Sequence, residues 1–246
     1  MSDTLSAETI SISGHNGDQI EAYLARPATE AKRGGVVVIH HMPGYDRATK
    51  EITRRFAELG YDALMPNLYH REAPGAEPSD AAAKARELGG VPDERLIGDV
   101  AAAAAHLRSL GSSNQKVGVI GYCSGGRQSV LAACNVDLQA AVDCYGAFVT
   151  HVEGAGDFGR PHIEDQLPNL KCPLLGLFGN DDKYPAPDQV DRLEQLLKQA
   201  DKPYEFHRYD GAGHAFFNTD RPAYRAEAAQ DGWERIERFF KTNLGA

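Results

Sequence analysis

The stretch with the clearest chemical potential is KVGVIGYCSGGR, residues 116–127, in which a cysteine stands between two glycines. An apolar run ends at Gly121 and a helical pattern begins near Gly125, so Cys123 would lie at a strand-to-helix turn. Small residues two before and two after a nucleophile allow such an abrupt turn, known as a nucleophile elbow. The positive end of the helix dipole then favours a thiolate. We expect Cys123 to be a nucleophile. A turn that only packs, or that cradles a phosphate, is the alternative.

The adjacent Ser124 is a second candidate nucleophile. The residues two positions from it are Tyr122 and Gly126. Because tyrosine is bulky, the tight-turn requirement fails on one side. The sequence therefore favours Cys123.

An acid and a base follow in the chain order that this kind of site requires, nucleophile, acid, base. The apolar run Leu174–Phe178 precedes Asp181 and Asp182, and the run Tyr204–Tyr209 precedes His214 in a glycine-flanked loop. Functional groups in open α/β sheets lie at the carboxyl ends of the strands. We expect His214 to take the thiol proton and Asp181 to hold the imidazole. Either aspartate could instead cap the next helix, and a loop histidine could simply be solvated.

The loop after the apolar run Val36–Ile39 reads HHMPG. In a site of this kind, that loop supplies one backbone N–H to an oxyanion hole and the residue after the nucleophile supplies the other. We expect the donors to be Met42 and Ser124, since the proline after Met42 has no N–H. His40 and His41 would point to opposite faces of an extended strand and could not chelate one ion, so no metal site is expected.

The elements that must position these groups alternate between strands and helices. Two short alternating segments, Thr9–Ser13 and Gln19–Leu24, flank a turn and predict a hairpin. Continuous apolar runs predict strands buried on both faces at Val36–Ile39, Ala63–Met65, Val117–Ile120, Ala140–Val142 and Leu174–Phe178, with a last strand at Tyr204–Tyr209. Helical spacing of apolar residues recurs in Thr49–Leu59, Ala81–Leu88, Asp93–Leu110, Val190–Leu197 and Ala223–Asn243. This alternation predicts an α/β fold, a mostly parallel doubly wound sheet of about eight strands with an N-terminal antiparallel hairpin.

Composition limits the class of protein. The 246 residues are 42% hydrophobic and carry 26 basic against 35 acidic residues, a net charge of -9. We expect one domain over residues 1–246, with a cap-like excursion near residues 70–98 that covers the site.

The excess of acidic residues disfavours nucleic acid and membrane surfaces as partners. The first ten residues have neither a basic nor an apolar segment, so we do not expect a secretory signal there, and the four cysteines fit no disulfide or metal pattern. We therefore expect a cytoplasmic monomer or homodimer.

Together the motifs resemble the dienelactone hydrolases, a branch of the α/β-hydrolase superfamily that uses a cysteine nucleophile. The resemblance covers roughly residues 20–240 and is carried by GYCSGG at 121–126, GNDDKYP at 179–185 and GAGHAF at 211–216. It implies the α/β-hydrolase fold and a carboxymethylenebutenolidase-like carboxylic ester hydrolase without a cofactor, with Cys123, Asp181 and His214 as the triad. The proline four residues beyond the acid selects Asp181 over Asp182.

Two positions depart from the family pattern. Members active on dienelactones carry a glutamate that contacts the resting cysteine, and that position is His41 here. An arginine four residues after the catalytic histidine often binds the substrate carboxylate, and Asn218 stands there. His41 could still hydrogen-bond Cys123. We therefore expect an ester or lactone without a carboxylate. The expected pocket residues are aromatic neighbours of these loops, Tyr45, Tyr122, Tyr145, Phe148, Tyr184 and Phe217.

The leading hypothesis is a hydrolase that cleaves a small ester or lactone through a thioacyl intermediate on Cys123. A carboxylesterase or a phosphotriester-cleaving relative with another substrate is an alternative. A non-catalytic protein that binds a small ligand in the same cleft is another. A redox-sensing thiol is a third, weakened because no resolving cysteine lies nearby in the sequence.

Overall fold

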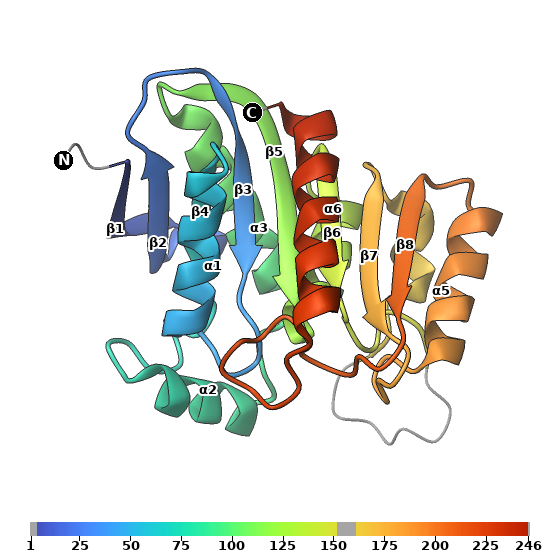
Figure 1. Cartoon of the computed structure of the whole chain (residues 1–246). Coiled ribbons are helices and arrows are strands. Elements are labelled where there is room, and N and C mark those ends of the chain that lie inside the picture. The colour runs from blue at the N-terminus through green and yellow to red at the C-terminus, as the bar shows by residue number, and fades with distance from the viewer. Residues whose placement is uncertain (1–3, 152–160, 246) are drawn as a thin grey trace.

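The computed structural model describes residues 4–151 and 161–245 and is built around one eight-stranded sheet (Figure 1). The strands lie in the order β1-β2-β4-β3-β5-β6-β7-β8. β1 pairs antiparallel with β2, and β2 pairs antiparallel with β4, whereas all the other neighbours are parallel. The strands are β1 (Leu5–Ser13), β2 (Gln19–Pro27), β3 (Arg33–Ile39), β4 (Asp62–Pro66), β5 (Ser113–Tyr122), β6 (Ala140–Cys144), β7 (Leu174–Gly179) and β8 (Tyr204–Tyr209).

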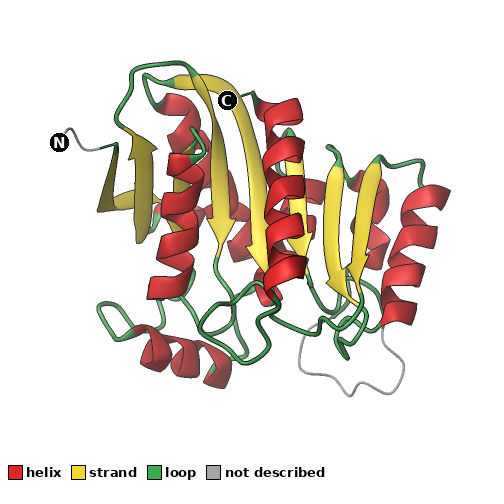
Figure 2. Ribbon diagram, viewed as in Figure 1, coloured by secondary structure: helices red, strands yellow, loops and turns green. Residues whose placement is uncertain are grey.

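Helices cover both faces of the sheet (Figure 2). They are α1 (Arg47–Glu58), α2 (Pro78–Glu87), α3 (Asp93–Ser109), α4 (Ser124–Asn135), α5 (Pro187–Gln199) and α6 (Ala226–Leu244), and the short 3-10 turns are η1 (His15–Gly17) and η2 (Glu164–Asn169). Each expected strand and helix is present, with ends that differ by a few residues. The expected doubly wound sheet with an N-terminal hairpin is therefore confirmed.

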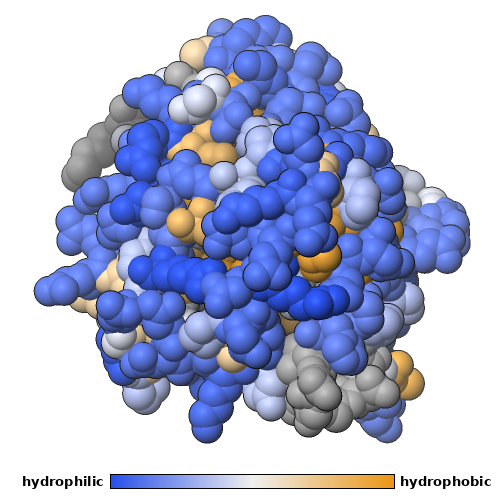
Figure 3. Space-filling model, turned by 90° about the vertical axis from the view of Figure 1, so that its right-hand side faces the viewer, coloured by the Kyte–Doolittle hydropathy of each residue, from blue (hydrophilic) through white to orange (hydrophobic). Residues whose placement is uncertain are grey.

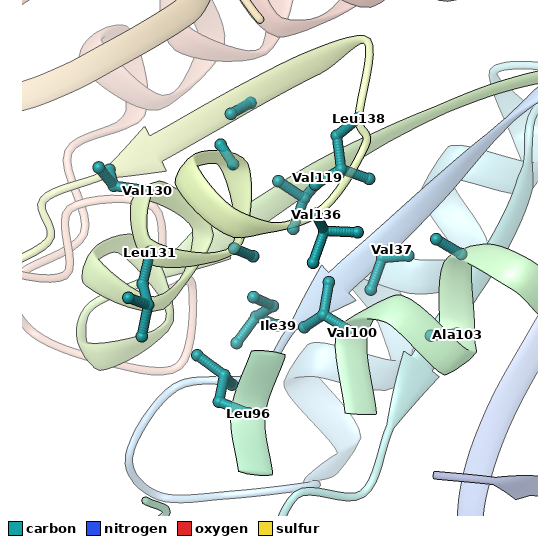
Figure 4. Close-up of a cluster of buried hydrophobic side chains, with 14 of the residues drawn as sticks. Val37, Ile39, Leu96, Val100, Ala103, Val119, Val130, Leu131, Val136 and Leu138 are labelled. Atoms are coloured by element: carbon teal, nitrogen blue, oxygen red, sulfur yellow. The ribbon is translucent and has the colours of Figure 1, made fainter. Parts of the chain in front are cut away.

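The central strands are buried on both faces, which explains their uninterrupted apolar sequence. In β3, Val37 and Ile39 face the core beneath α3 and α4, whereas Val36 and Val38 face the core beneath α1 and α6. Figure 4 shows part of the first core, in which Val100 of α3 lies beside residues of β3. Successive side chains of a strand point to opposite faces, so a strand that feeds two cores must be apolar throughout.

The carboxyl ends of the parallel strands point to one edge of the sheet, and α2 lies along that edge (Figure 1). The segment before α2 packs on the loop that follows β3: the Tyr69 hydroxyl donates to the Met42 carbonyl at 3.0 Å. A Cβ on Gly44 would lie 3.2 Å from the Pro78 carbonyl oxygen. The excursion near residues 70–98 therefore supports this loop from the side.

Polar residues predominate on the face seen in Figure 3, where apolar side chains are visible only in small, interrupted areas. Within residues 4–151 and 161–245, none of the helices combines the length and the apolar character that crossing a bilayer requires.

Candidate active site

Cys123 sits between β5 and α4 with φ 58° and ψ -121°. This left-handed region is costly for a residue with a side chain, by about 1–3 kcal/mol, and such strain clusters at functional sites. The glycines around it make the turn possible. A Cβ on Gly121 would lie 1.8 Å from the Gly125 carbonyl oxygen, and one on Gly125 would lie 2.6 Å from the Ile39 oxygen. Cys123 is thereby raised at the N-terminus of α4, the elbow that the sequence predicted.

The Cys123 thiol contacts three donors. His214 hydrogen-bonds the sulfur from its side chain, and Met42 and Ser124 do so from the backbone. Burial by itself would raise the pKa of Cys123, but these contacts and the charge of His214 outweigh it and lower the pKa below the ordinary value. The two backbone donors are those expected from the sequence for an oxyanion hole.

The imidazole of His214 is polarised in the complementary direction. Burial would lower its pKa, but hydrogen bonds to Asp182 and Cys123, with the charges of both, raise the pKa of His214 to about 10. Both shifts have the same physical origin, because a thiolate and an imidazolium stabilise each other. The geometry thus favours Cys123 and His214 as an ion pair.

The carboxylate that holds His214 is Asp182, so the expectation of Asp181 is wrong. His214 Nδ1 lies 2.9 Å from Asp182 Oδ2, and the Tyr184 N–H donates to Asp182 Oδ1 at 2.9 Å. Asp182 is buried, whereas the Asp181 side chain is exposed. The reason is the turn after β7: the Asp181 N–H donates to the Ala212 carbonyl, and this directs the next side chain toward His214. Spacing to a proline does not encode that direction.

His41 contacts Asp46 and not the thiol, which corrects a second expectation. His41 Nε2 lies 2.6 Å from Asp46 Oδ2. Asp46 also caps α1 by accepting from the Thr49 N–H at 2.9 Å. Burial would raise the pKa of Asp46, but the His41 bond and the Thr49 contacts lower it to about 2. His41 is therefore anchored to the first turn of α1.

Two separate cavities flank the catalytic candidates. The one that contains the thiol has a volume of about 470 Å³ and a mostly apolar wall. Its lining residues are Met42, Cys123, Ser124, Arg127, Ala147, Phe148, Asp181, Asp182, Lys183, Tyr184 and His214. None of these belongs to residues 70–98, so that segment does not form the wall of this cavity.

The second cavity, of about 370 Å³, lies toward α1 and α6, on the other side of His41. Five expected pocket residues line it: His41, Tyr122, Tyr145, Phe217 and Asn218. Cys123 does not line it. Two others, Phe148 and Tyr184, line the thiol cavity. Tyr45 lines neither cavity, because its ring is buried in the core under the Lys50 ammonium, 4.1 Å from the ring centre.

Arg127 is the site residue that sequence reasoning missed. It lines the thiol cavity from the first turn of α4 and is only 2% exposed. Its two terminal nitrogens each lie 2.9 Å from an Asp93 oxygen, and one also donates to the Pro161 carbonyl. Nothing in the sequence around Arg127, three residues after Ser124, indicates that its side chain would be buried. Its partner lies 34 positions away in the chain.

In the parts of the chain that the structure describes, no three His, Cys, Asp or Glu side chains lie close enough together to hold a metal ion.

Comparison with known proteins identifies the family. The model of the dienelactone hydrolase family matches residues 20–244. A "Putative carboxymethylenebutenolidase" of Methylorubrum extorquens is 35% identical over 226 residues, which cover 90% of this chain and 76% of that protein. A protein of the same description from Escherichia coli K12 is 34% identical, over 92% of this chain and 83% of its own length.

A solved structure agrees with this result. The "Putative Dienelactone Hydrolase" from Klebsiella pneumoniae superposes with a TM-score of 0.86 at 30% identity, covering 97% of this chain and 99% of that one. The family match spans most of the chain, including β5, α4 and the loops that carry Asp182 and His214. The chain therefore belongs to the dienelactone hydrolase family and has the α/β-hydrolase fold.

Proposed function

We propose that this protein hydrolyses a small ester or lactone through a covalent intermediate on Cys123. The observation that carries the proposal is the contact of one thiol with His214 and with two backbone N–H groups, while Asp182 holds the far side of the imidazole. A nucleophile, an oriented base and two oxyanion donors are the parts that acyl transfer requires.

In the acylation step, the Cys123 thiolate attacks the substrate carbonyl carbon. The carbonyl oxygen gains negative charge and accepts from the Met42 and Ser124 N–H groups. The tetrahedral intermediate then collapses, the bond to the leaving oxygen breaks, and the His214 imidazolium protonates that oxygen. The products are a free alcohol, or the opened ring of a lactone, and a thioester on Cys123.

In the deacylation step, neutral His214 removes a proton from a water molecule that attacks the thioester carbonyl. The same two N–H groups stabilise the oxyanion, and collapse expels the Cys123 thiolate and releases the acid. His214 is again an imidazolium, so the ion pair is restored. Asp182 remains ionised and holds the Nδ1–H tautomer throughout.

The walls of the thiol cavity favour a flat, uncharged substrate group. The Phe148 and Tyr184 rings stack with 6.0 Å between their centres and 20° between their planes. Met42, which is 41% exposed, adds a further apolar side chain to the wall. The buried cation Arg127 is already engaged by Asp93. A planar acyl or aryl group can pack on the aromatic wall. A carboxylate would find Arg127 already paired, and the other cation of the wall, Lys183, is exposed to water next to the carboxylates of Asp181 and Asp182.

The experiment is hydrolysis of a small aryl ester by the wild type and by Cys123→Ala, with intact mass recorded during turnover. We expect activity to disappear in the variant and a transient acyl adduct to map to Cys123 in the wild type. Unchanged activity in Cys123→Ala would overturn the covalent mechanism. A preference for an acidic lactone over a matched neutral one would overturn the proposed substrate class.

The aromatic wall is tested by Phe148→Leu. We expect kcat/KM to fall by about 3- to 10-fold for an aryl ester, corresponding to the roughly 0.5–1.5 kcal/mol of an aromatic contact, and to change little for a short alkyl ester. Tyr224→Leu is the matched control, because Tyr224 is exposed and lines neither cavity. Equal losses on both esters would contradict the specificity argument.

A further inference from the structure

His40 is the first residue after β3, and it is buried with only 1% of its surface exposed. Both of its ring nitrogens have partners. Nδ1 lies 2.9 Å from the His41 carbonyl oxygen, and Nε2 lies 3.3 Å from the Leu68 backbone nitrogen. It lines neither cavity and does not belong to the residues that contact the thiol.

The two partners fix the tautomer of this imidazole. A carbonyl oxygen can only accept, so Nδ1 must carry the hydrogen, and a backbone N–H can only donate, so Nε2 must present its lone pair. Burial lowers the pKa of His40 to about 4, although the bond to His41 partly opposes the shift. His40 is therefore a neutral ring with a defined donor and a defined acceptor at neutral pH.

The carbonyl that His40 binds belongs to the peptide group whose N–H faces the nucleophile. The His41 C=O and the Met42 N–H are the two ends of one planar unit. The carbonyl also accepts from the Gly44 N–H at 2.9 Å, so two donors hold it. Because the peptide is rigid, fixing the direction of its carbonyl fixes the direction of the opposite N–H. Donation to the oxygen also polarises the N–H bond cooperatively.

Contacts from the end of β4 hold His40 itself. The Tyr69 ring meets the imidazole edge-on, with 4.7 Å between the ring centres. The Tyr69 hydroxyl bonds the Met42 carbonyl, which belongs to the next peptide group along the loop. Leu68 therefore acts through the imidazole on the peptide group before Met42. Tyr69 acts directly on the peptide group after Met42.

We propose that His40 is a positioning residue, which orients and polarises the His41–Met42 peptide as an oxyanion donor toward Cys123. The inference rests on the proposed function for its catalytic consequence. Its role is distinct from those of His214 and Asp182, because His40 touches neither substrate nor thiol. The bond to Leu68 keeps the donor nitrogen directed at the loop.

Two substitutions separate the functions of the two nitrogens. His40→Asn places an amide near the position of Nδ1 and can still donate to the His41 carbonyl. His40→Gln reaches toward the position of Nε2 and can still accept from Leu68, but it has no donor for that carbonyl. His106→Gln in α3 is the control, since His106 is a part-buried histidine that lines neither cavity and whose Nε2 lacks a partner.

We expect His40→Gln to lower kcat for an aryl ester by roughly 10- to 100-fold with little change in KM, less than the 10²- to 10³-fold loss of a whole oxyanion donor. His40→Asn should keep most of kcat. Ultraviolet titration should give a higher Cys123 pKa in His40→Gln than in the wild type, because the Met42 N–H stabilises the thiolate. The control should change neither quantity.

The proposal is overturned if His40→Gln and His40→Asn lose activity equally while the Cys123 pKa stays unchanged, because a purely structural role predicts that result. Nitrogen NMR of the wild-type imidazole provides a test that needs no variant. The expected spectrum is that of a neutral ring protonated at Nδ1, and a ring protonated at Nε2 would refute the assignment. Failure of acyl-adduct formation on Cys123 would overturn the proposed function, but it would leave the tautomer and the Cys123 pKa test intact.

Discussion

Asp182 and Asp181 are adjacent carboxylates that line the same cavity, and the structure assigns them different roles. Replacing either by asparagine removes one negative charge at nearly the same place. Only Asp182 bonds His214, at 2.9 Å, whereas the Asp181 side chain is exposed. The pair Asp182→Asn and Asp181→Asn therefore separates the orienting bond from the general effect of charge.

The expected loss in Asp182→Asn has two parts. A hydrogen bond to a charged group contributes about 1.5–3 kcal/mol, and a buried polar group left without a partner costs about 1–3 kcal/mol. The second part arises because Asp182 accepts from both Tyr184 and His214, and an amide has only one accepting atom. An amide N–H that faces His214 would favour the imidazole tautomer with its hydrogen on Nε2, which cannot take a proton from the thiol or from water. Together these effects lower kcat/KM by roughly 10²- to 10⁴-fold.

The assay is steady-state hydrolysis of an aryl ester by both variants and the wild type, with thermal unfolding recorded to establish that all three are folded. Asp181→Asn should stay within about twofold of the wild type, as expected for an exposed charge. The reasoning is refuted if Asp181→Asn loses as much activity as Asp182→Asn. It is also refuted if a folded Asp182→Asn retains more than a tenth of the activity.

Three further predictions concern the thiol, the first turn of α1 and the elbow. His214→Asn should raise the pKa of Cys123, because the imidazole is the main group that offsets burial, and ultraviolet titration of the thiolate would detect it; an unchanged pKa would contradict the ion pair. Asp46→Asn keeps an oxygen that can cap α1 but removes the carboxylate charge of Asp46 that faces His41. The pKa of Asp46 is lowered in the fold from 3.8 to about 2, so its stabilising contribution is present above pH 3.8 and is lost as the pH falls through 2. Because the carboxylate is partly exposed, we expect this contribution to be on the order of 1 kcal/mol, and the two unfolding curves should differ at pH 7 and converge in acid. Gly121→Ala should lower the melting temperature strongly or prevent folding, since its Cβ would lie 1.8 Å from a backbone oxygen in the first turn of α4; a melting temperature equal to that of the wild type would contradict the close approach.

Much of the scaffold could be read from periodicity alone. The apolar run in β3 indicated a strand buried on both faces, and it does contact two cores. The spacing of apolar residues in α6 indicated one buried face, and Trp233, Ile236 and Phe240 are buried there. These elements are predictable because each repeats the geometry of its own secondary structure, whatever its neighbours are.

The elbow was equally local. Gly121, Cys123 and Gly125 stand two residues apart, and the clash that a side chain would cause at either glycine lies within the same turn or against the adjacent strand. The backbone donors Met42 and Ser124 followed from this turn and from the strand before the HHMPG loop. Both N–H groups belong to the backbone, so their positions depend only on the path of the chain, which the motif determines.

Side-chain direction outside such motifs required the tertiary structure. Asp181 and Asp182 are equivalent by composition, and only the bond from the Asp181 N–H to the Ala212 carbonyl, between the loops after β7 and β8, turns Asp182 to His214. The sequence allowed His41 to face the thiol, but in the structure its ring binds Asp46 at the N-terminus of α1.

The sequence by itself determined the order of strands and helices, the cysteine elbow and the presence of an acid and a base at the correct strand ends, because these depend on short-range sterics and on periodicity. The tertiary structure alone decided which aspartate serves the histidine, which of two cavities opens on the thiol, and that a buried neutral histidine braces the peptide beside it. Each of these depends on contacts between loops far apart in the chain, whose relative placement is set by the packing of the whole sheet.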